Sequence, residues 1–144
     1  MEYRHIFWKL GFAKHLHRKR IEAIINELGL FDGQFPILDV LDELGTASQK
    51  EVANKLHVSA ASMTNSVKRL EKNGYLTCIV SSKDRRSHQL SLTEKGKEAR
   101  RFCVEHFDQS DHAIMKDIAQ NELEIFEKVL DNIIEKLKEF EKGE

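Results

Sequence analysis

The sequence predicts a mainly α fold with one small β-hairpin, an α+β arrangement in which most of the chain is helical. Apolar residues recur at steps of three and four over long stretches near both ends of the 144-residue chain, as in amphipathic helices. Residues 48–74 contain two short helical patterns separated by a break at His57-Val58. Residues 75–92 contain two apolar runs around a polar segment, which is typical of paired strands.

The first two elements are predicted to be helices. Residues 2–28 read as one helix that ends at Gly29, and a second helix covers residues 34–44 and ends at Gly45. Asp32 is the expected N-cap of the second helix, and Pro36 is tolerated in its first turns because the N–H there needs no helical partner. The residues expected to pack beneath the following helices are Phe35, Leu38, Leu41 and Leu44.

The next segment, residues 48–74, has the pattern of two helices joined by a tight turn. Ser48 and Glu51 form a capping box, and Ser59 offers the N-cap of the second helix. Gly74 can adopt the left-handed conformation that ends a helix. The second helix has a buried stripe of Met63, Val67 and Leu70. Its opposite face is polar and consists of Ser62, Thr64, Asn65, Lys68, Arg69 and Lys72. This is a helix-turn-helix pattern.

A hairpin follows, with strands expected at residues 75–80 and 88–92 and a polar loop at 81–87 that carries three cations. A hairpin after such a helix is a wing, so the fold class becomes a winged helix-turn-helix. A fifth helix is predicted from an N-cap at Thr93 to about residue 118, and a last helix from the capping pair Asn121 and Glu124. The last helix repeats apolar residues at 3-4-3-4-3, and these are Leu123, Phe126, Leu130, Ile133, Leu137 and Phe140. Such a seam predicts a partner helix.

Several of these segments, in this order, resemble the MarR family of bacterial transcriptional regulators. They are residues 34–38, 58–59, 69–75, 84–87 and 92–96. The resemblance implies a homodimer that binds duplex DNA, with the first and last helices pairing between subunits. Three domains are therefore expected: an N-terminal dimerisation helix at residues 1–28, a winged helix-turn-helix DNA-binding domain at 29–97, and C-terminal dimerisation helices at 98–144.

The charge distribution agrees with a nucleic-acid partner although the net charge is only −1. Residues 46–97 carry ten cations and four acids, a net charge of +6, whereas residues 98–144 carry seven cations and thirteen acids, a net charge of −6. Positive potential is therefore concentrated on the helix-turn-helix and wing. No apolar run is long enough to span a membrane, no signal peptide is recognisable, and two cysteines make no disulfide framework. We expect a cytoplasmic protein.

An α-helix fits the major groove of DNA, so the helix after Ser59 is expected to present side chains to base edges. Ser62, Thr64 and Asn65 are predicted to read bases, and Lys68 and Arg69 to hold phosphates. By resemblance, Arg86 enters the minor groove with Asp84 aligning it. Asn65 departs from the family, which often carries arginine there. The full predicted DNA-binding set is Gln49, Lys50, Ser59, Ser62, Thr64, Asn65, Lys68, Arg69, Lys83, Asp84, Arg85 and Arg86.

A symmetric dimer is expected to bind an inverted-repeat operator, with its two recognition helices about 34–36 Å apart. The resemblance also implies a ligand-responsive repressor, with an effector cleft between the dimerisation helices and the DNA-binding lobe. The residues predicted to line this cleft are Phe12, His15, Leu16, His17 and Phe35. His17 also has a simpler interpretation, as a packing histidine at a domain or dimer boundary.

Three other interpretations of the sequence compete with this one: an enzyme, a sensor with metal or thiol chemistry, and a winged helix that binds only protein. An enzyme is not expected, because the chain lacks a phosphate-binding glycine loop, a G-x-S-x-G motif and H-E-x-x-H, and no cofactor is predicted. A metal sensor would need ligands from several elements, because no H-x-x-x-H or C-x-x-C spacing exists. A thiol sensor would need an activated cysteine, whereas Cys78 and Cys103 are both expected to be structural. A winged helix that binds only protein is disfavoured by Arg85 and Arg86.

Overall fold

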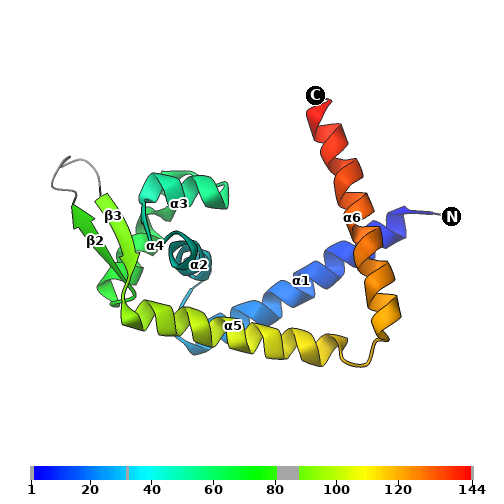
Figure 1. Cartoon of the computed structure of the whole chain (residues 1–144), viewed down its shortest axis with the longest axis horizontal. Coiled ribbons are helices and arrows are strands. Elements are labelled where there is room, and N and C mark those ends of the chain that lie inside the picture. The colour runs from blue at the N-terminus through cyan, green and yellow to red at the C-terminus, as the bar shows by residue number, and fades with distance from the viewer. Residues whose placement is uncertain (1, 32, 81–87, 144) are drawn as a thin grey trace. The chain divides into compact units, whose positions relative to one another are not determined.

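The computed structural model describes residues 2–31, 33–80 and 88–143, which form two compact units, residues 1–107 and 108–144 (Figure 1). The helices of the described part are α1 (Arg4–Glu27), α2 (Gln34–Leu44), α3 (Gln49–Leu56), α4 (Ala60–Lys72), α5 (Glu94–Met115) and α6 (Gln120–Lys142). The strands are β1 (Thr46–Ser48), β2 (Leu76–Val80) and β3 (His88–Leu92). The predicted fold class, mainly α with a small hairpin, is confirmed.

The core of the first unit lies where α2, α3 and α4 pack on one another and on the sheet (Figure 1). The predicted stripe of α4 is buried, with Met63, Val67 and Leu70 all less than 9% exposed. The prediction for α2 was partly wrong: Leu38 and Leu41 are buried, but Leu44 is 40% exposed because it is the last residue of the helix. Burying these apolar side chains supplies the main favourable term for folding.

The predicted caps position α3 and α4. The Ser48 hydroxyl accepts a hydrogen bond from the Glu51 N–H at 3.1 Å, and the Ser59 hydroxyl accepts one from the Ser62 N–H at 3.2 Å. Gly74 has φ +81° just after α4, in the left-handed region where glycine has no steric penalty. His57 adopts the same region, with φ 56°, at the turn between the two helices.

The sheet contains a strand that the sequence did not predict. Its order is β1-β3-β2, all antiparallel, and Ala47 of β1 pairs with Leu90 of β3. A run of three residues is too short to display an alternating pattern, so Thr46–Ser48 carries no readable strand signal of its own. Its position depends on the ladder with β3 and on Ala47, which is fully buried. The wing sheet is therefore anchored directly to the start of α3.

The last two helices differ from the prediction at two of their ends. The Thr93 hydroxyl accepts a hydrogen bond from the Gly96 N–H at 3.1 Å, so the predicted cap of α5 is confirmed, but α5 ends at Met115 rather than near residue 118. The Asn121 cap was wrong: α6 begins at Gln120, and Glu122 accepts a hydrogen bond from the Ala119 N–H at 3.3 Å. The capping carboxylate is therefore that of Glu122, two residues before the predicted Glu124.

Helix α6 has an apolar stripe that stays largely exposed in the described part of the chain. None of the residues in Gln120–Lys142 is buried. The exposed fractions are 48% for Phe126, 51% for Leu137 and 75% for Phe140. In the described part of the chain, no helix is long and apolar enough to cross a membrane.

Candidate nucleic-acid interface

The N-terminal half of α4 presents polar side chains outward. The Ser62 hydroxyl donates to the Ser59 carbonyl at 2.8 Å, which holds it at the cap while leaving its oxygen free to accept. Ser62 and Asn65 are exposed, and the Asn65 amide can both donate to and accept from a base edge. Thr64 is less accessible, because it is half-buried and its hydroxyl lies 3.4 Å from the Ala60 carbonyl. Of the three predicted base-reading residues, Ser62 and Asn65 are thus the more accessible.

Gln49 connects the two helices of the helix-turn-helix. Its amide nitrogen donates to the Ala60 carbonyl at 2.8 Å and to the Thr64 hydroxyl at 3.2 Å. These bonds fix the start of α3 against the first turn of α4. The sequence analysis predicted a phosphate contact for Gln49. It did not predict these hydrogen bonds, because Ala60 and Thr64 are eleven and fifteen positions away in the sequence.

A groove of about 530 Å³ lies between the start of α3, one side of α4 and the sheet. Lys50 of α3 and Lys68 of α4 both line it, so two cations predicted to bind phosphate share one surface hollow. Its other lining residues are Ser48, Gln49, Thr64, Val67, Glu71, Cys78, His88 and Leu90. Lysine ammonium groups on either side of a groove favour a polyanion that follows it.

Arg69 is exposed, but its orientation is restrained. Its guanidinium lies 4.5 Å from the centre of the Phe31 ring, an aromatic side chain that is itself 52% exposed. Such a cation–π contact still leaves the guanidinium N–H groups available for an anion. Phe31 precedes α2, so this pairing also ties α4 to the segment between α1 and α2. No local signal in the sequence pairs residues so far apart.

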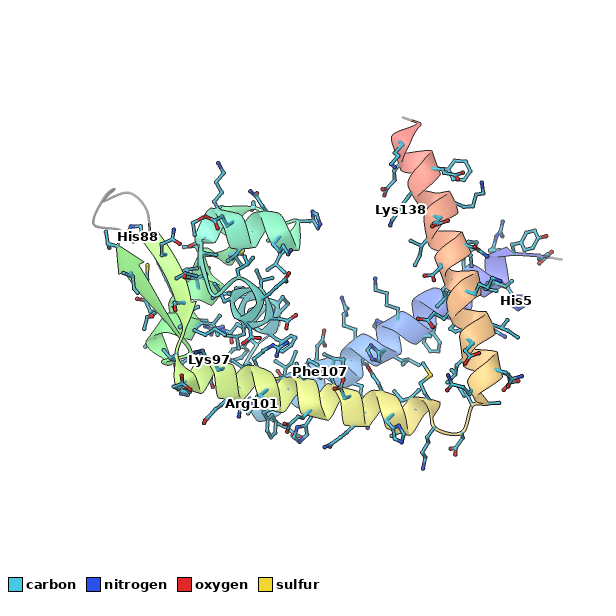
Figure 2. All side chains as sticks on the ribbon, in the orientation of Figure 1. His5, His88, Lys97, Arg101, Phe107 and Lys138 are labelled. Carbon is cyan, nitrogen blue, oxygen red and sulfur yellow. The ribbon has the colours of Figure 1, made fainter. Side chains whose placement is uncertain are left out.

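The wing begins and ends in the two strands β2 and β3. His88, labelled in Figure 2, is the first residue of β3 and pairs with Val80, the last residue of β2. The predicted wing residues Lys83, Asp84, Arg85 and Arg86 lie outside the described residues. Their roles in binding stay predictions.

Contacts behind the interface hold the end of α4 to the start of α5. The Lys95 ammonium donates to the Asn73 carbonyl at 2.7 Å and lies 4.5 Å from the centre of the Tyr75 ring. The Thr93 hydroxyl donates to the Gly74 carbonyl. These bonds satisfy carbonyl groups that the end of a helix leaves without partners. They join the recognition helix to α5, and sequence analysis gave none of them.

The residues predicted to line an effector cleft have different environments. Phe35 packs edge-on against Phe107 of α5, labelled in Figure 2, with ring centres 4.9 Å apart. On α1, Phe12 and Leu16 are about half exposed, at 48% and 50%, and Phe12 stacks on Trp8. His15 lines a shallow polar hollow with Lys14 and Arg18, and His17 is exposed on the same helix. The cleft stays a prediction.

Neither cysteine has the environment of an activated thiol. Burial raises the pKa of Cys103 to about 11, and it is fully buried as predicted. The pKa of Cys78 is also raised, mainly by desolvation and then by the negative charge of Glu71. Cys78 lies 3.6 Å from His88 Nδ1 but is only half-buried. Both thiols therefore stay protonated at neutral pH, which makes them weak nucleophiles.

Together, the capped α3–α4 pair, the antiparallel strands beside it and the cationic groove define a winged helix-turn-helix DNA-binding protein. Residues 31–88, which run from the segment before α2 to the start of β3, match the MarR family model. This segment is a MarR-type helix-turn-helix, and the chain is a DNA-binding transcriptional regulator of that type.

The chain is similar to curated proteins that are named as transcriptional regulators. The chain is 28% identical over 118 residues to the HTH-type transcriptional regulator FarR of Neisseria gonorrhoeae, covering 82% of this chain and 81% of that one. It is 28% identical over 132 residues to the transcriptional regulator AdcR of Streptococcus pneumoniae, covering 88% of each. These relatives are transcriptional regulators rather than enzymes.

Solved structures share the fold. The Bacillus subtilis YusO protein superposes with a TM-score of 0.78 at 18% identity, covering 92% of this chain and 94% of that one. A mutant of Staphylococcus aureus MepR bound to an oligodeoxyribonucleotide superposes with a TM-score of 0.66 at 18% identity, covering 95% and 99%. At these identities the likeness extends to the fold alone.

Proposed function

We propose that two copies of this chain bind an inverted-repeat operator and repress transcription until a ligand weakens the complex. The observation that carries this proposal is the exposed polar face of α4, with Ser62 and Asn65 beside a groove lined by Lys50 and Lys68. Side chains that hydrogen-bond bases next to cations that hold phosphates are what specific duplex recognition needs. The DNA-bound MepR structure, which shares the fold, supports this use of the surface.

The exposed apolar stripe of α6 supports a homodimer. Exposed Phe126, Leu137 and Phe140 repeat at the spacing of a helix–helix seam and lie on the terminal helix of the second unit. A large apolar stripe left in water is unfavourable, and an identical helix or the first helix of a second copy would cover it. Two-fold symmetry of the dimer then requires an inverted repeat in the DNA.

Selection of bound sequences from random duplex DNA, followed by binding titrations at fixed salt, tests the proposal. We expect an inverted repeat to be selected. Asn65→Ala should reduce discrimination at one base position by about 1–3 kcal/mol, because it removes a side chain that contacts a base edge. Arg86→Ala should weaken binding to the operator, because it removes the predicted minor-groove cation. Arg101→Ala, which removes a cation from the exposed surface of α5, is the matched control for lost charge.

The dimer is tested by Leu137→Glu, measured by sedimentation and by operator titration. Leu137 is already half exposed in the single chain, so a carboxylate there should leave the fold intact. We expect a monomer that loses tight operator binding, because two half-sites are no longer bound together. A wild-type chain that stays monomeric at working concentration, or that selects no inverted repeat, contradicts the proposal.

A further inference from the structure

An aromatic ring outside the predicted DNA-binding set lies beside the recognition helix. Phe31, in the segment between α1 and α2, is 52% exposed, although its neighbour Leu30 is buried. The Arg69 guanidinium of α4 lies over this ring, with its carbon 4.5 Å from the ring centre. We call these two side chains the Phe31–Arg69 pair.

Both members of the pair are attached to well-anchored backbone. The Phe31 N–H donates to Gln34 Oε1 at 3.0 Å, and the Gln34 N–H donates back to the Phe31 carbonyl at 3.1 Å. Gln34 is itself buried, so these two bonds fix the backbone that carries the ring. On α4, the residue that follows Arg69 is Leu70, which is fully buried. The ring is therefore held at a fixed place beside the helix.

The position of Arg69 on α4 places it at one edge of the face predicted to read bases. Residues four or seven positions apart share one face of a helix, so Arg69 continues the exposed stripe of Ser62 and Asn65. Successive residues lie about 100° apart around the helix axis. Lys68 therefore lies on the other side of Asn65, where it lines the cationic groove together with Lys50. The predicted base-reading face thus has cations on both sides.

Cations on both sides suit the geometry of the major groove. A helix of about 10–12 Å diameter fills a groove of about 12 Å width, so the backbone of one DNA strand runs along each side of it. In the proposed complex, Lys50 and Lys68 face one backbone and Arg69 faces the other. A guanidinium that rests on a ring keeps N–H groups at its edge for phosphate oxygens. It also loses less conformational freedom on binding than a side chain that moves freely in water.

We propose that Phe31 is a positioning residue for operator binding: its ring holds the Arg69 guanidinium where it contacts a phosphate of the DNA strand opposite the cationic groove. The inference rests on the proposed operator-binding function and adds to it a residue that acts through Arg69 rather than on the DNA. Phosphate contacts position a protein without reading sequence. The Phe31–Arg69 pair therefore contributes to affinity for every operator and not to discrimination between operators.

A double-mutant cycle on the full chain, read by operator titrations at several salt concentrations, tests the pair. We expect Arg69→Ala to raise the operator Kd by about tenfold at low salt and to lower the salt slope by about one for each subunit. Phe31→Leu removes the ring face and should raise the Kd by about threefold. Phe31→Tyr keeps a ring that attracts cations and should restore the wild-type Kd. In the Arg69→Ala background, Phe31→Leu should have no further effect.

Lys72→Ala is the matched control for the cycle, because it removes an exposed cation from the same helix only three residues from Arg69. Phe31→Leu should keep its full effect on the Kd in that background, since the ring contacts Arg69. Arg69→Lys tests the pair with Phe31 intact. It keeps the charge, but an ammonium group has no planar face to place on a ring, so this variant should also bind the operator more weakly.

The inference and the proposed function fail in different ways. If Phe31→Leu weakens binding equally with and without Arg69, then Phe31 contacts DNA itself or only supports the fold, and the positioning role is overturned. An operator Kd that Phe31→Leu or Arg69→Ala leaves unchanged overturns it too, while the operator-binding function stands. A wild-type chain that selects no operator overturns both. If Phe31→Leu does not fold, Arg69→Lys and Phe31→Tyr still decide the inference.

Discussion

The amide of Gln49 donates a hydrogen bond to the hydroxyl of Thr64 across 3.2 Å, so the first residue of α3 holds the recognition helix in place. The same nitrogen donates to the Ala60 carbonyl at 2.8 Å. A residue predicted to contact phosphate thus has a structural role that its neighbour Lys50 lacks, since Lys50 is exposed and lines the cationic groove. Substituting Gln49 should therefore affect stability, whereas substituting Lys50 should affect mainly the electrostatic part of DNA binding.

Gln49→Ala should lower the free energy of unfolding by about 1 kcal/mol, because it removes hydrogen bonds that link two helices. Operator binding should weaken as well, since α4 is no longer held in register. Lys50→Ala should leave stability within about 0.5 kcal/mol of the wild type but reduce the salt dependence of operator binding by about one charge. Urea titrations and salt-dependent binding curves measure both. Equal stability losses in the two variants would refute the distinction.

Gly96 permits the close approach of α5 to the sheet. A Cβ at this position would overlap the Tyr75 carbonyl oxygen, a backbone atom that cannot rotate away. Gly96→Ala should therefore destabilise the fold by about 2 kcal/mol or more. Gly11→Ala is the matched control, because nothing lies within 4 Å of its added Cβ and alanine is the better helix former. That variant should gain up to about 1 kcal/mol. Thermal unfolding of both proteins checks the contrast.

His57 occupies the left-handed region at the helix-turn-helix turn, with φ 56°. An L-residue in that conformation costs about 1–2 kcal/mol, whereas glycine adopts it freely. His57→Gly should therefore be neutral or raise the free energy of unfolding by up to about 1 kcal/mol. His57→Val should lower it, because a β-branched side chain is the least tolerant of a positive φ. If His57→Gly is less stable than the wild type, the imidazole stabilises the fold by more than the strained backbone conformation costs.

The buried thiol of Cys103 makes stability depend on pH in the alkaline range. Burial raises its pKa from the ordinary 9.0 to about 11, so between these values the folded chain keeps a proton that the unfolded chain has lost. Stability is therefore complete below pH 9 and falls as the pH rises toward 11, by at most roughly 2–3 kcal/mol. Urea titrations of the wild type and Cys103→Ala should show this contribution only in the wild type. A thiol that reacts rapidly with Ellman's reagent in the native protein at pH 7.5 would contradict its burial.

Arg100 of α5 lies 3.0 Å from Asp39 and 3.3 Å from Asp42, so one guanidinium joins α5 to two carboxylates of α2. Arg100 is far from both aspartates in the sequence, and none of the three residues belongs to a motif. The spacing of apolar residues predicts which face of a helix is buried. It does not predict which charged residues of another element its polar face will contact. Arg69 over Phe31 and Lys95 over Tyr75 arise in the same way.

Much of the interface was nevertheless predictable from local signals. Ser48 and Ser59 cap α3 and α4, Gly74 ends α4, and Met63, Val67 and Leu70 form its buried stripe. Each of these depends on residues within one or two turns, where backbone geometry and side-chain spacing decide the outcome. The cap predicted at Asn121 and the burial predicted for Leu44 were both wrong. Both residues lie at helix ends, where moving the end by one or two residues changes which residue is the cap and which is buried.

The sequence by itself determined the fold class, the helix-turn-helix, the strands of the wing and the polar face of α4, because periodicity and capping act over short distances. Only the tertiary structure decided that Thr46–Ser48 is a strand, that Gln49 is bonded to α4 and that Arg69 lies over the Phe31 ring. These features join residues that are distant in the chain. Their geometry depends on how the helices pack, and no local pattern encodes it.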